Sequence, residues 1–420
     1  MRILMVSALE VWALSGQGGA PSLYKTLEGL SRRGHEVDFV TSRIGANHHH
    51  GAPPQQPPSI PGVRFHLFDL PSLAEMRLRM PSPVLYVDQK LRFAALFPLL
   101  AGRLAKRLDR QQRFDLLYGY EVHGVLALRQ LEQRGRPLVT RFQGTVMHPY
   151  LDDRVALARR YEEVLALKTR ADLTIMTDDG TQGDEVLQRL NPESAGKVRF
   201  WRNGLDLDRS RAPSAEEAAA ARTTLGLANY ELVLVTAVRL ARWKRIDRAI
   251  DAVAALKGQN VDARLLIVGD GEERANLEQR ARSLGVTDRV VFVGGVPQEA
   301  VQQYLWAADV FLSLNELSNV GNPLLEAMRT GRCIVTLDEG DTRDLIRDDE
   351  TGVLLPSGDP TTVANALASL AVDPPRRTRL GEAARQSAEA NFWSWQQRID
   401  AEVDALEQLV AQTKPEAAHV

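Results

Sequence analysis

The segment "VFLSLNELSNVGNPLLEAMRTGRCIVTL", residues 310–337, decides the fold of this 420-residue chain. A short apolar run, a polar loop rich in Ser, Asn and Gly, an apolar helix and a second apolar run follow one another directly. Short runs of Val, Ile and Leu separated by a helix are typical of buried parallel strands joined by a crossover. The segment therefore predicts a strand–helix–strand unit of an α/β sheet, with a tight loop after its first strand.

The start of this helix combines features that favour an anion. Pro323 suits the first helical position, where no amide hydrogen is needed, and Gly321 lets the backbone turn tightly and leaves room for a ligand. The free amides of the first turn and the helix dipole attract negative charge. Glu326, one turn in, accepts hydrogen bonds and fits a pair of vicinal hydroxyls. A nucleotide diphosphate with its ribose has both features; an ordinary crossover with a solvated Glu326 is the alternative.

The alternation of apolar runs and helical periods extends along the whole chain. Candidate strands of the first half are "RILMVSAL", "EVDFVTS", "VRFHLF", "DLLYGY", "PLVTRF", "DLTIMTD" and "VRFWRN", and the pattern starts again at "YELVLVTAVRL". Two doubly wound parallel sheets are expected, with ligands at the carboxyl ends of both, in the cleft between them. We place one domain at residues 1–205, a second at 206–390, and a C-terminal helix over 391–413 that packs back across the junction.

Composition and charge indicate a soluble enzyme. Apolar residues make up 44% and charged residues 25% of the chain, and the net charge of -2 gives no electrostatic basis for binding nucleic acid. The single cysteine, Cys333, lies in an apolar run, which suits a buried thiol and a reducing cytosol. The N-terminus lacks a signal-peptide pattern, and no run approaches eighteen apolar residues. We therefore expect a cytoplasmic protein.

A second basic element strengthens the nucleotide hypothesis. The stretch "VRLARWKRID" follows a predicted strand and places Arg239 and Lys244 at the strand's end and the next helix's start. Two cations there can neutralise a diphosphate; solvated surface charges are the alternative. In the first half, "GQGGAPS" offers Gly18 and Gly19 after the first strand, without the third glycine of the dinucleotide fingerprint.

The order of these segments resembles a retaining glycosyltransferase of family four. The resemblance covers nearly the whole chain and rests on "GQGGAPSLYKTLEGLSRRGHEVDFVTS", "VRFWRNGLDLD", "AVRLARWKRIDRAIDA", "LLIVGDGEE", "RVVFVGGVP", "YLWAADVFLSL", "GNPLLEAMRTGRCIVT" and "ETGVLL". It implies an α/β fold of the GT-B type: two facing Rossmann-like, doubly wound parallel-sheet domains with a C-terminal crossover helix. It also implies transfer of a sugar from a nucleotide-diphosphate sugar to a hydroxyl acceptor, with no other cofactor.

The resemblance assigns roles to the matching positions. Arg239 and Lys244 match the pair that holds the donor diphosphate, and Glu326 matches the carboxylate that holds the donor ribose. His123, in "GYEVHG", resembles a histidine near the sugar and acceptor, whereas His35, in "RGHEV", is expected to be structural at a helix–strand turn. The further donor-side positions are Gly18, Gly19, Val296, Asn319, Val320, Gly321 and Asn322.

The chain departs from the family pattern at two places. The first of the two family glutamates, which contacts the donor sugar, falls on Ser318, and Glu316 lies two residues earlier as a candidate substitute. The turn "TRFQGT" carries Arg141 and Gln143 where many relatives have a histidine. Both residues are candidates for the acceptor side, and contact with a donor phosphate is the alternative. The donor base, the donor sugar and the acceptor stay open; polysaccharide, glycolipid and small-metabolite glycosides are the acceptor classes.

The same motifs are also compatible with three alternative hypotheses: a sugar-nucleotide epimerase, a glycoside phosphorylase, or a non-catalytic nucleotide-sugar binding protein. No Asp-x-Asp pair stands where a metal would hold the diphosphate, so we predict metal independence. The segment 76–108 mixes aliphatic, aromatic and basic residues. It is either an acceptor-side helix packed on the N-terminal sheet or a basic amphipathic helix that docks peripherally on the inner membrane face to reach a lipid-linked acceptor.

Overall fold

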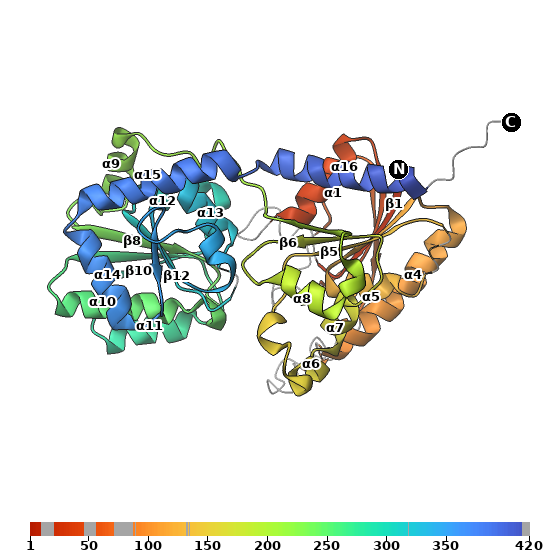
Figure 1. Ribbon diagram of the computed structural model, residues 1–420, viewed down its shortest axis with the longest axis horizontal. Coiled ribbons are helices and arrows are strands. Elements are labelled where there is room, and N and C mark those ends of the chain that lie inside the picture. The colour runs from red at the N-terminus through yellow and green to blue at the C-terminus, as the bar shows by residue number, and fades with distance from the viewer. Residues whose placement is uncertain are drawn as a thin grey trace.

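The computed structural model describes residues 1–9, 21–45, 56–70, 87–88, 90–131, 133, 135–317 and 319–413. The chain forms two α/β domains that lie side by side, each built on one parallel sheet (Figure 1). The strand order is β3-β2-β1-β4-β5-β6-β7 in the first sheet and β10-β9-β8-β11-β12-β13 in the second. The predicted fold class is confirmed.

The N-terminal domain contains the seven-stranded sheet. Its strands are β1 (Arg2–Ser7), β2 (Glu36–Ser42), β3 (Val63–Phe68), β4 (Leu116–Tyr120), β5 (Leu138–Phe142), β6 (Leu173–Thr177) and β7 (Val198–Trp201). Its helices are α1 (Ser22–Arg32), the π-helical segment η2 (Leu91–Leu96), α4 (Phe97–Gln111), α5 (Glu121–Leu128), α6 (Arg154–Arg159), α7 (Tyr161–Leu167) and α8 (Gly183–Leu190). Short 3-10 turns η3 (His148–Tyr150) and η4 (Pro192–Ser194) join some of them.

The C-terminal domain contains the six-stranded sheet. Its strands are β8 (Leu232–Ala237), β9 (Ala263–Val268), β10 (Val290–Gly294), β11 (Val310–Ser313), β12 (Cys333–Leu337) and β13 (Val353–Leu355). Its helices are α9 (Ala215–Thr224), α10 (Ile246–Gly258), α11 (Arg274–Ser283), α12 (Gln298–Ala307), α13 (Asn322–Arg329), α14 (Pro360–Ala371) and α15 (Pro374–Asn391), with 3-10 turns η5 (Arg242–Lys244) and η6 (Gly340–Asp344).

Each sheet reverses its winding direction beside its central strand. In the first sheet Ile3 of β1 pairs with Val37 on one side and Leu116 on the other. In the second sheet Leu234 of β8 pairs with Leu265 and Val310. Ligands of doubly wound sheets bind at such switch points, at the carboxyl ends of the strands. The carboxyl ends of β8 and β11 are therefore the place to look for a donor site.

The last helix, α16 (Trp395–Thr413), belongs in space to the N-terminal domain, although α15 before it packs on the C-terminal domain (Figure 1). Apolar side chains of α16, including Ile399 and Val403, are buried with the core of β1 and α1. Salt bridges of 2.8 Å from Arg32 to Asp400 and 2.9 Å from Arg33 to Asp404 line the α1–α16 contact. The chain thus crosses between the domains twice.

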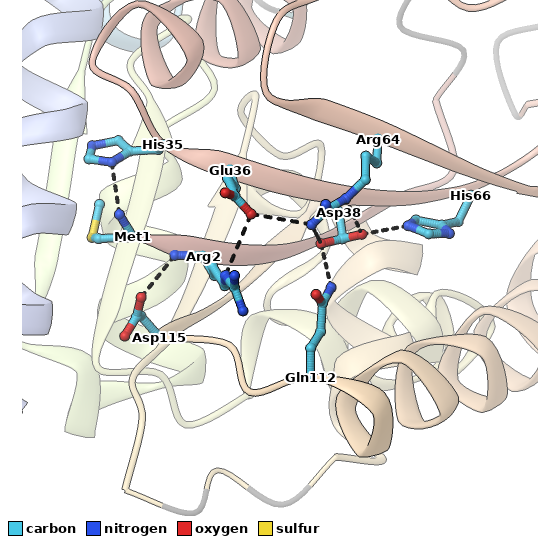
Figure 2. A network of polar contacts seen from close by, with 9 residues as sticks. All are labelled: Met1, Arg2, His35, Glu36, Asp38, Arg64, His66, Gln112 and Asp115. Carbon is cyan, nitrogen blue, oxygen red and sulfur yellow. Dashed lines mark hydrogen bonds and ion pairs between the residues drawn. The ribbon is translucent and has the colours of Figure 1, made fainter.

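A polar network ties the start of β2 to its surroundings, near the amino ends of the strands (Figure 2). The buried Asp38 carboxylate accepts hydrogen bonds from Arg64 at 2.9 Å, His66 at 2.6 Å and Gln112 at 2.7 Å. His35 contacts the amino group of Met1 at 3.1 Å and Glu407 of α16 at 2.9 Å. These contacts lie at strand starts, so they fit a structural role for His35.

Candidate functional site

Polar residues gather at the carboxyl ends of β8 and β11. Arg239 follows β8 by two residues, and Lys244 ends η5, the turn that leads into α10. Residues 314–321 connect β11 to α13. The two connections touch, because the backbone amide of Glu316 donates to the carbonyl of Trp243 at 3.1 Å. Lys244 and the loop before α13 therefore come from separate segments to one edge of the sheet.

Lys244 is a largely desolvated cation at this edge. Its Nζ lies 3.9 Å from the centroid of the Trp243 ring. In the amide orientation that satisfies both groups, the Asn315 side-chain oxygen accepts from Nζ at 3.3 Å. Burial lowers the pKa of Lys244 to about 8, although Asp179 of the N-terminal domain favours the charged form. An ammonium short of water gains more from an anionic ligand than a solvated one does.

Arg239 contrasts with Lys244 because its side chain is 64% exposed. It forms an ion pair with Glu272 at 3.1 Å. Exposed ion pairs of this kind contribute little to stability, so this pairing is easily exchanged for a ligand.

Glu316, the candidate substitute for the absent family acid, is held by arginines. Its carboxylate forms a close ion pair with Arg245 and lies 3.6 Å from Arg248. Arg245 also pairs with Asp247 at 2.9 Å and has a left-handed backbone with φ of 46°. Left-handed conformations strain residues with a side chain. The ion pairs of Arg245 hold this turn directly after Lys244.

Glu326 occupies a desolvated position on α13. The helix buries Leu324, Leu325 and Met328, and this orientation leaves Glu326 partly buried on a neighbouring face. Burial, together with the nearby Asp206 carboxylate, raises the pKa of Glu326 to about 7. Gln298 donates to Glu326 Oε1 at 3.3 Å, which partly offsets the effect.

A small pocket opens beside Glu326. Its lining includes Asp206, Gln298 and Gln302. Gln298 begins α12 two residues after Val296, which is partly buried against the core. Asp206 and Gln298 were not predicted from the sequence, although Asp206 ends "NGLD" and Gln298 lies two residues after Val296.

The loop before α13 also contacts the other domain. The backbone amide of Val320 donates to the carbonyl of Asp179 at 3.1 Å, and Asn319 is buried. A Cβ on Gly180 would lie 2.9 Å from the amide nitrogen of Val320, so this approach requires glycine. The side-chain amide of Asn322 accepts a hydrogen bond from Asn203 and donates one to the carbonyl of Gly204. Asn203 and Gly204 belong to the segment that connects the domains.

On the N-terminal side, His123 lies in an aromatic setting. Its ring centroid is 5.8 Å from that of Phe93 in η2 and 6.5 Å from that of Phe97 in α4. Burial lowers the pKa of His123 to about 4. The imidazole is therefore neutral near pH 7 and can donate or accept one hydrogen bond at each nitrogen.

Arg141 and Gln143 have different environments although they are two residues apart. Arg141 is 1% exposed; its Nη1 donates to Thr177 Oγ1 at 2.8 Å and its Nε lies 3.6 Å from Glu402 of α16. Gln143 is partly exposed and donates to the Tyr120 hydroxyl at 2.6 Å. The structure places Arg141 in the domain core, whereas Gln143 stays at the sheet edge.

Glu121 is a residue at this edge that our sequence analysis did not single out. It is the first residue of α5 and has a φ of 61°. Its Oε1 accepts a hydrogen bond from the backbone amide of Gln143 at 2.7 Å. Burial raises the pKa of Glu121 to about 7. A strained residue with a shifted pKa at a strand end is a functional candidate. Its position directly after the "DLLYGY" strand was the sequence signal.

Three predicted residues, Gly18, Gly19 and Ser318, lie outside the described residues. Among the residues that the structure describes, no group of three or more His, Cys, Asp or Glu side chains is arranged to hold a metal ion.

Comparisons with known proteins match this arrangement. A family model described as "Glycosyltransferase Family 4" matches residues 16–209, and one described as "Glycosyl transferases group 1" matches residues 219–387. The N-acetyl-alpha-D-glucosaminyl L-malate synthase of Bacillus anthracis is 26% identical over 87% of both chains. Several other curated relatives match over about half of their own length.

Solved structures share the fold. Sucrose-phosphate synthase from Thermosynechococcus elongatus has a TM-score of 0.74, covers 98% of this chain and 100% of its own, and is 22% identical. Anabaena HepE in complex with UDP has a TM-score of 0.69, covers 96% of this chain and 100% of its own, and is 21% identical.

Two facing parallel-sheet domains with these matches define the class: the chain is a glycosyltransferase with the GT-B fold. The two models meet close to the interdomain connection and together span most of the chain. The chain belongs to glycosyltransferase family 4.

Proposed function

We propose that the protein moves a sugar from a nucleotide-diphosphate sugar to a hydroxyl acceptor, with retention at the anomeric carbon. The proposal is carried by the contact of the Lys244 turn with the loop before α13 at the carboxyl edge of the C-terminal sheet. Glu326 lies one turn into the same helix. A diphosphate suits Lys244, Arg239 and the free amides at Gly321. A ribose diol suits the ionised Glu326 carboxylate.

In the proposed reaction, the bond between the anomeric carbon and the leaving phosphate oxygen breaks while the acceptor oxygen bonds the same face of that carbon. The acceptor proton passes to the departing phosphate. Lys244, Arg239 and the helix start stabilise the charge that develops on the diphosphate, an effect worth about 3–4 kcal/mol per well-placed donor. Closure of the domains excludes water from the cleft.

The N-terminal edge supplies the acceptor side in this proposal. Gln143 and Glu121 offer an amide and a carboxyl for acceptor hydroxyls, and neutral His123 adds a nitrogen donor or acceptor. Arg141 makes no acceptor contact in this proposal, because it is enclosed in the domain core. Replacement of Gln143 by Ala is expected to raise the KM for acceptor and leave the KM for donor unchanged; a change confined to donor KM would contradict this assignment.

Solved structures of the related Anabaena HepE contain UDP and UDP-glucose, so UDP-glucose is the first donor to test. Polysaccharide, glycolipid and small polyol acceptors complete the screen. Proton NMR of the product's anomeric signal decides the stereochemistry: the donor's α configuration is expected to persist. A β product would contradict retention, and sugar isomerisation without acceptor would favour an epimerase.

Metal independence is part of the proposal, because Lys244 and Arg239 provide the positive charge that a divalent ion would otherwise supply. Transfer after dialysis against EDTA is expected to match the untreated rate. Complete loss that Mg²⁺ or Mn²⁺ restores would contradict it.

Peripheral contact with an anionic membrane is a second proposal, carried by the outer faces of η2 and α4. Leu91 is 56% and Leu99 40% exposed, and the basic residues Arg103, Lys106 and Arg107 follow on the exposed face of α4. An apolar stretch with basic residues beside it suits a membrane interface. Of the helices that the structure describes, none is long and apolar enough to span a membrane.

Vesicle flotation at low salt tests this contact. The double change Leu91→Ser with Leu99→Ser is expected to reduce co-flotation with anionic vesicles. Val372→Ser is the control, because Val372 is 77% exposed on the C-terminal domain. Failure of the wild-type protein to co-float would remove the membrane proposal. The buried Cys333 thiol fits a cytoplasmic location on the inner face.

A further inference from the structure

The two segments that connect the domains, residues 202–205 and 393–395, run side by side. We call this contact the crossing. The amide of Leu205 donates to the carbonyl of Trp393, and the amide of Trp395 donates to the carbonyl of Leu205, both at 3.0 Å. A Cβ on Gly204 would lie 2.5 Å from the Cα of Trp395, so the close approach requires glycine. Any rotation of one domain against the other must therefore change the backbone conformation at this crossing.

The N-terminal domain holds the crossing through α16. Arg398 Nε donates to the carbonyl of Arg202 at 3.1 Å. The same guanidinium lies 4.8 Å from the centroid of the Trp201 ring and donates to Glu402 at 2.9 Å. Because Arg398 is 1% exposed, this anchor is shielded from water.

The C-terminal domain holds the crossing through one side chain of the donor helix. Asn203 Nδ2 donates to Asn322 Oδ1 at 3.0 Å, and Asn322 Nδ2 donates to the carbonyl of Gly204 at 3.3 Å. Asn322 is the first residue of α13, directly after Gly321 and one turn before Glu326. Both hydrogen-bonding groups of its amide thus face the crossing.

Asn322 was predicted from the sequence to contact the donor, and its two bonds to Asn203 and Gly204 point to a further role. We propose that Asn322 is a positioning residue that couples the first turn of α13 to the Asn203–Gly204 crossing, so that donor binding and domain orientation are set together. The inference rests on the proposed function, which places the diphosphate at this helix start.

The physical reason is that the amide makes two bonds to adjacent residues of the crossing. A ligand that pulls the α13 amides toward its phosphates moves Asn322 with them. The crossing must follow, or both bonds break and leave partly buried polar groups unpaired, at a cost of about 1–3 kcal/mol each. Closure is therefore favoured in the donor-bound protein, and an open arrangement disfavours the bound helix position.

A double-mutant cycle tests the coupling. The variants are Asn203→Ala, Asn322→Ala and their combination, with Asn203→Ser and Asn322→Ser as milder forms in case the alanine proteins fold poorly. Asn365→Ala is the matched control, because Asn365 is exposed on α14 and accepts a bond from Gln259 at 3.0 Å. Each protein is measured for UDP affinity, for the change of its radius of gyration on adding UDP, and for kcat and KM with UDP-glucose.

We expect Asn322→Ala, which removes both bonds, to lower kcat about tenfold and to lose most of the UDP-induced compaction, with UDP affinity changed less than about threefold. Asn203→Ala removes one of the two bonds and is expected to give a smaller loss of the same kind. The combined variant is expected to match Asn322→Ala, because that change alone already removes both bonds. The control should behave as wild type. Additive losses, or wild-type compaction and kcat in Asn322→Ala, would overturn the inference.

Failure of the proposed function gives a different result. Wild-type protein that binds no nucleoside diphosphate, whether UDP, GDP, ADP or dTDP, would remove the proposed function and this inference with it. Wild-type binding and turnover with an additive cycle would remove the inference alone.

Discussion

The carboxyl edges of the two sheets both carry charged residues, but the environments of these residues differ. At the C-terminal edge, Lys244 and Glu326 are desolvated and have pKa values of about 8 and about 7. At the N-terminal edge, Arg141 is enclosed and lies 3.6 Å from the buried Glu402 of α16. The environment of a charge at a strand end thus depends on which distant segment packs over it.

The largest effect on activity is expected from Lys244→Ala at the C-terminal edge. Loss of the ammonium should lower kcat/KM about 10²–10³-fold, because one preorganised charge donor at the developing diphosphate is removed. The melting temperature without ligand should not fall, since burial already disfavours this charged lysine. Steady-state kinetics and calorimetry measure both. A loss of stability without a kinetic defect would make Lys244 structural.

Glu402→Gln should give the opposite pattern. Burial alone raises the pKa of Glu402, but Arg398 and Arg141 outweigh it and hold the pKa below its usual value. Without the carboxylate, two buried guanidiniums lose their counterion, and the free energy of unfolding should fall by about 3 kcal/mol. Denaturant unfolding measures this loss, with UDP affinity as the control. Unchanged stability would show that this network does not hold the helix.

The wild-type network should also weaken in acid. Because the folded-state pKa of Glu402 is depressed, the ionised carboxylate stabilises the folded protein at pH values above the unfolded-state pKa. This stabilisation is lost as the pH falls through the folded-state pKa.

The pH dependence of kcat/KM should be bell-shaped, with apparent pKa values of about 7 and about 8. Below the first value Glu326 is protonated and loses its diol-accepting charge; above the second Lys244 loses its proton and its attraction for the diphosphate. Glu326→Gln should remove the acidic limb and Lys244→Arg the alkaline limb. An acidic limb that survives in Glu326→Gln would come from another carboxyl group, and Glu121, whose pKa is also about 7, would be the first to replace.

The smallest effect expected is a gain of stability in Glu326→Gln without ligand. Because burial raises the folded-state pKa of Glu326, its ionised form costs stability at high pH, and this cost disappears as pH falls below the unfolded-state value. At pH 8 the melting temperature should rise by roughly 2 °C, and at pH 4.5 the difference should be close to zero. Scanning calorimetry at both pH values measures it. A decrease at pH 8 would show that Glu326 contributes to packing instead.

The sheets and the donor edge were predictable from the sequence for local reasons. Buried parallel strands read as continuous apolar runs, and the residues that follow β8 and β11 meet at one edge whatever the loops do. Gly321, Pro323 and Glu326 belong to one helix start, so their spacing fixes their relation.

The environments of Arg141, Asn322 and Glu121 were not predictable in this way. Glu402 and Asn203, the partners of Arg141 and Asn322, lie far along the chain and meet them only after α16 and the crossing are in place. The strain at Glu121 is a backbone angle, which residue type does not reveal.

The most direct test of the donor site is the thermal stability of wild type and Lys244→Ala with UDP, GDP, ADP or dTDP. A nucleotide at a hundred times its dissociation constant should add about 2.7 kcal/mol to the wild-type protein. The account predicts a shift with one base that is lost in Lys244→Ala. Absence of a shift with all four nucleotides, or an equal shift in Lys244→Ala, would contradict a diphosphate site at this edge.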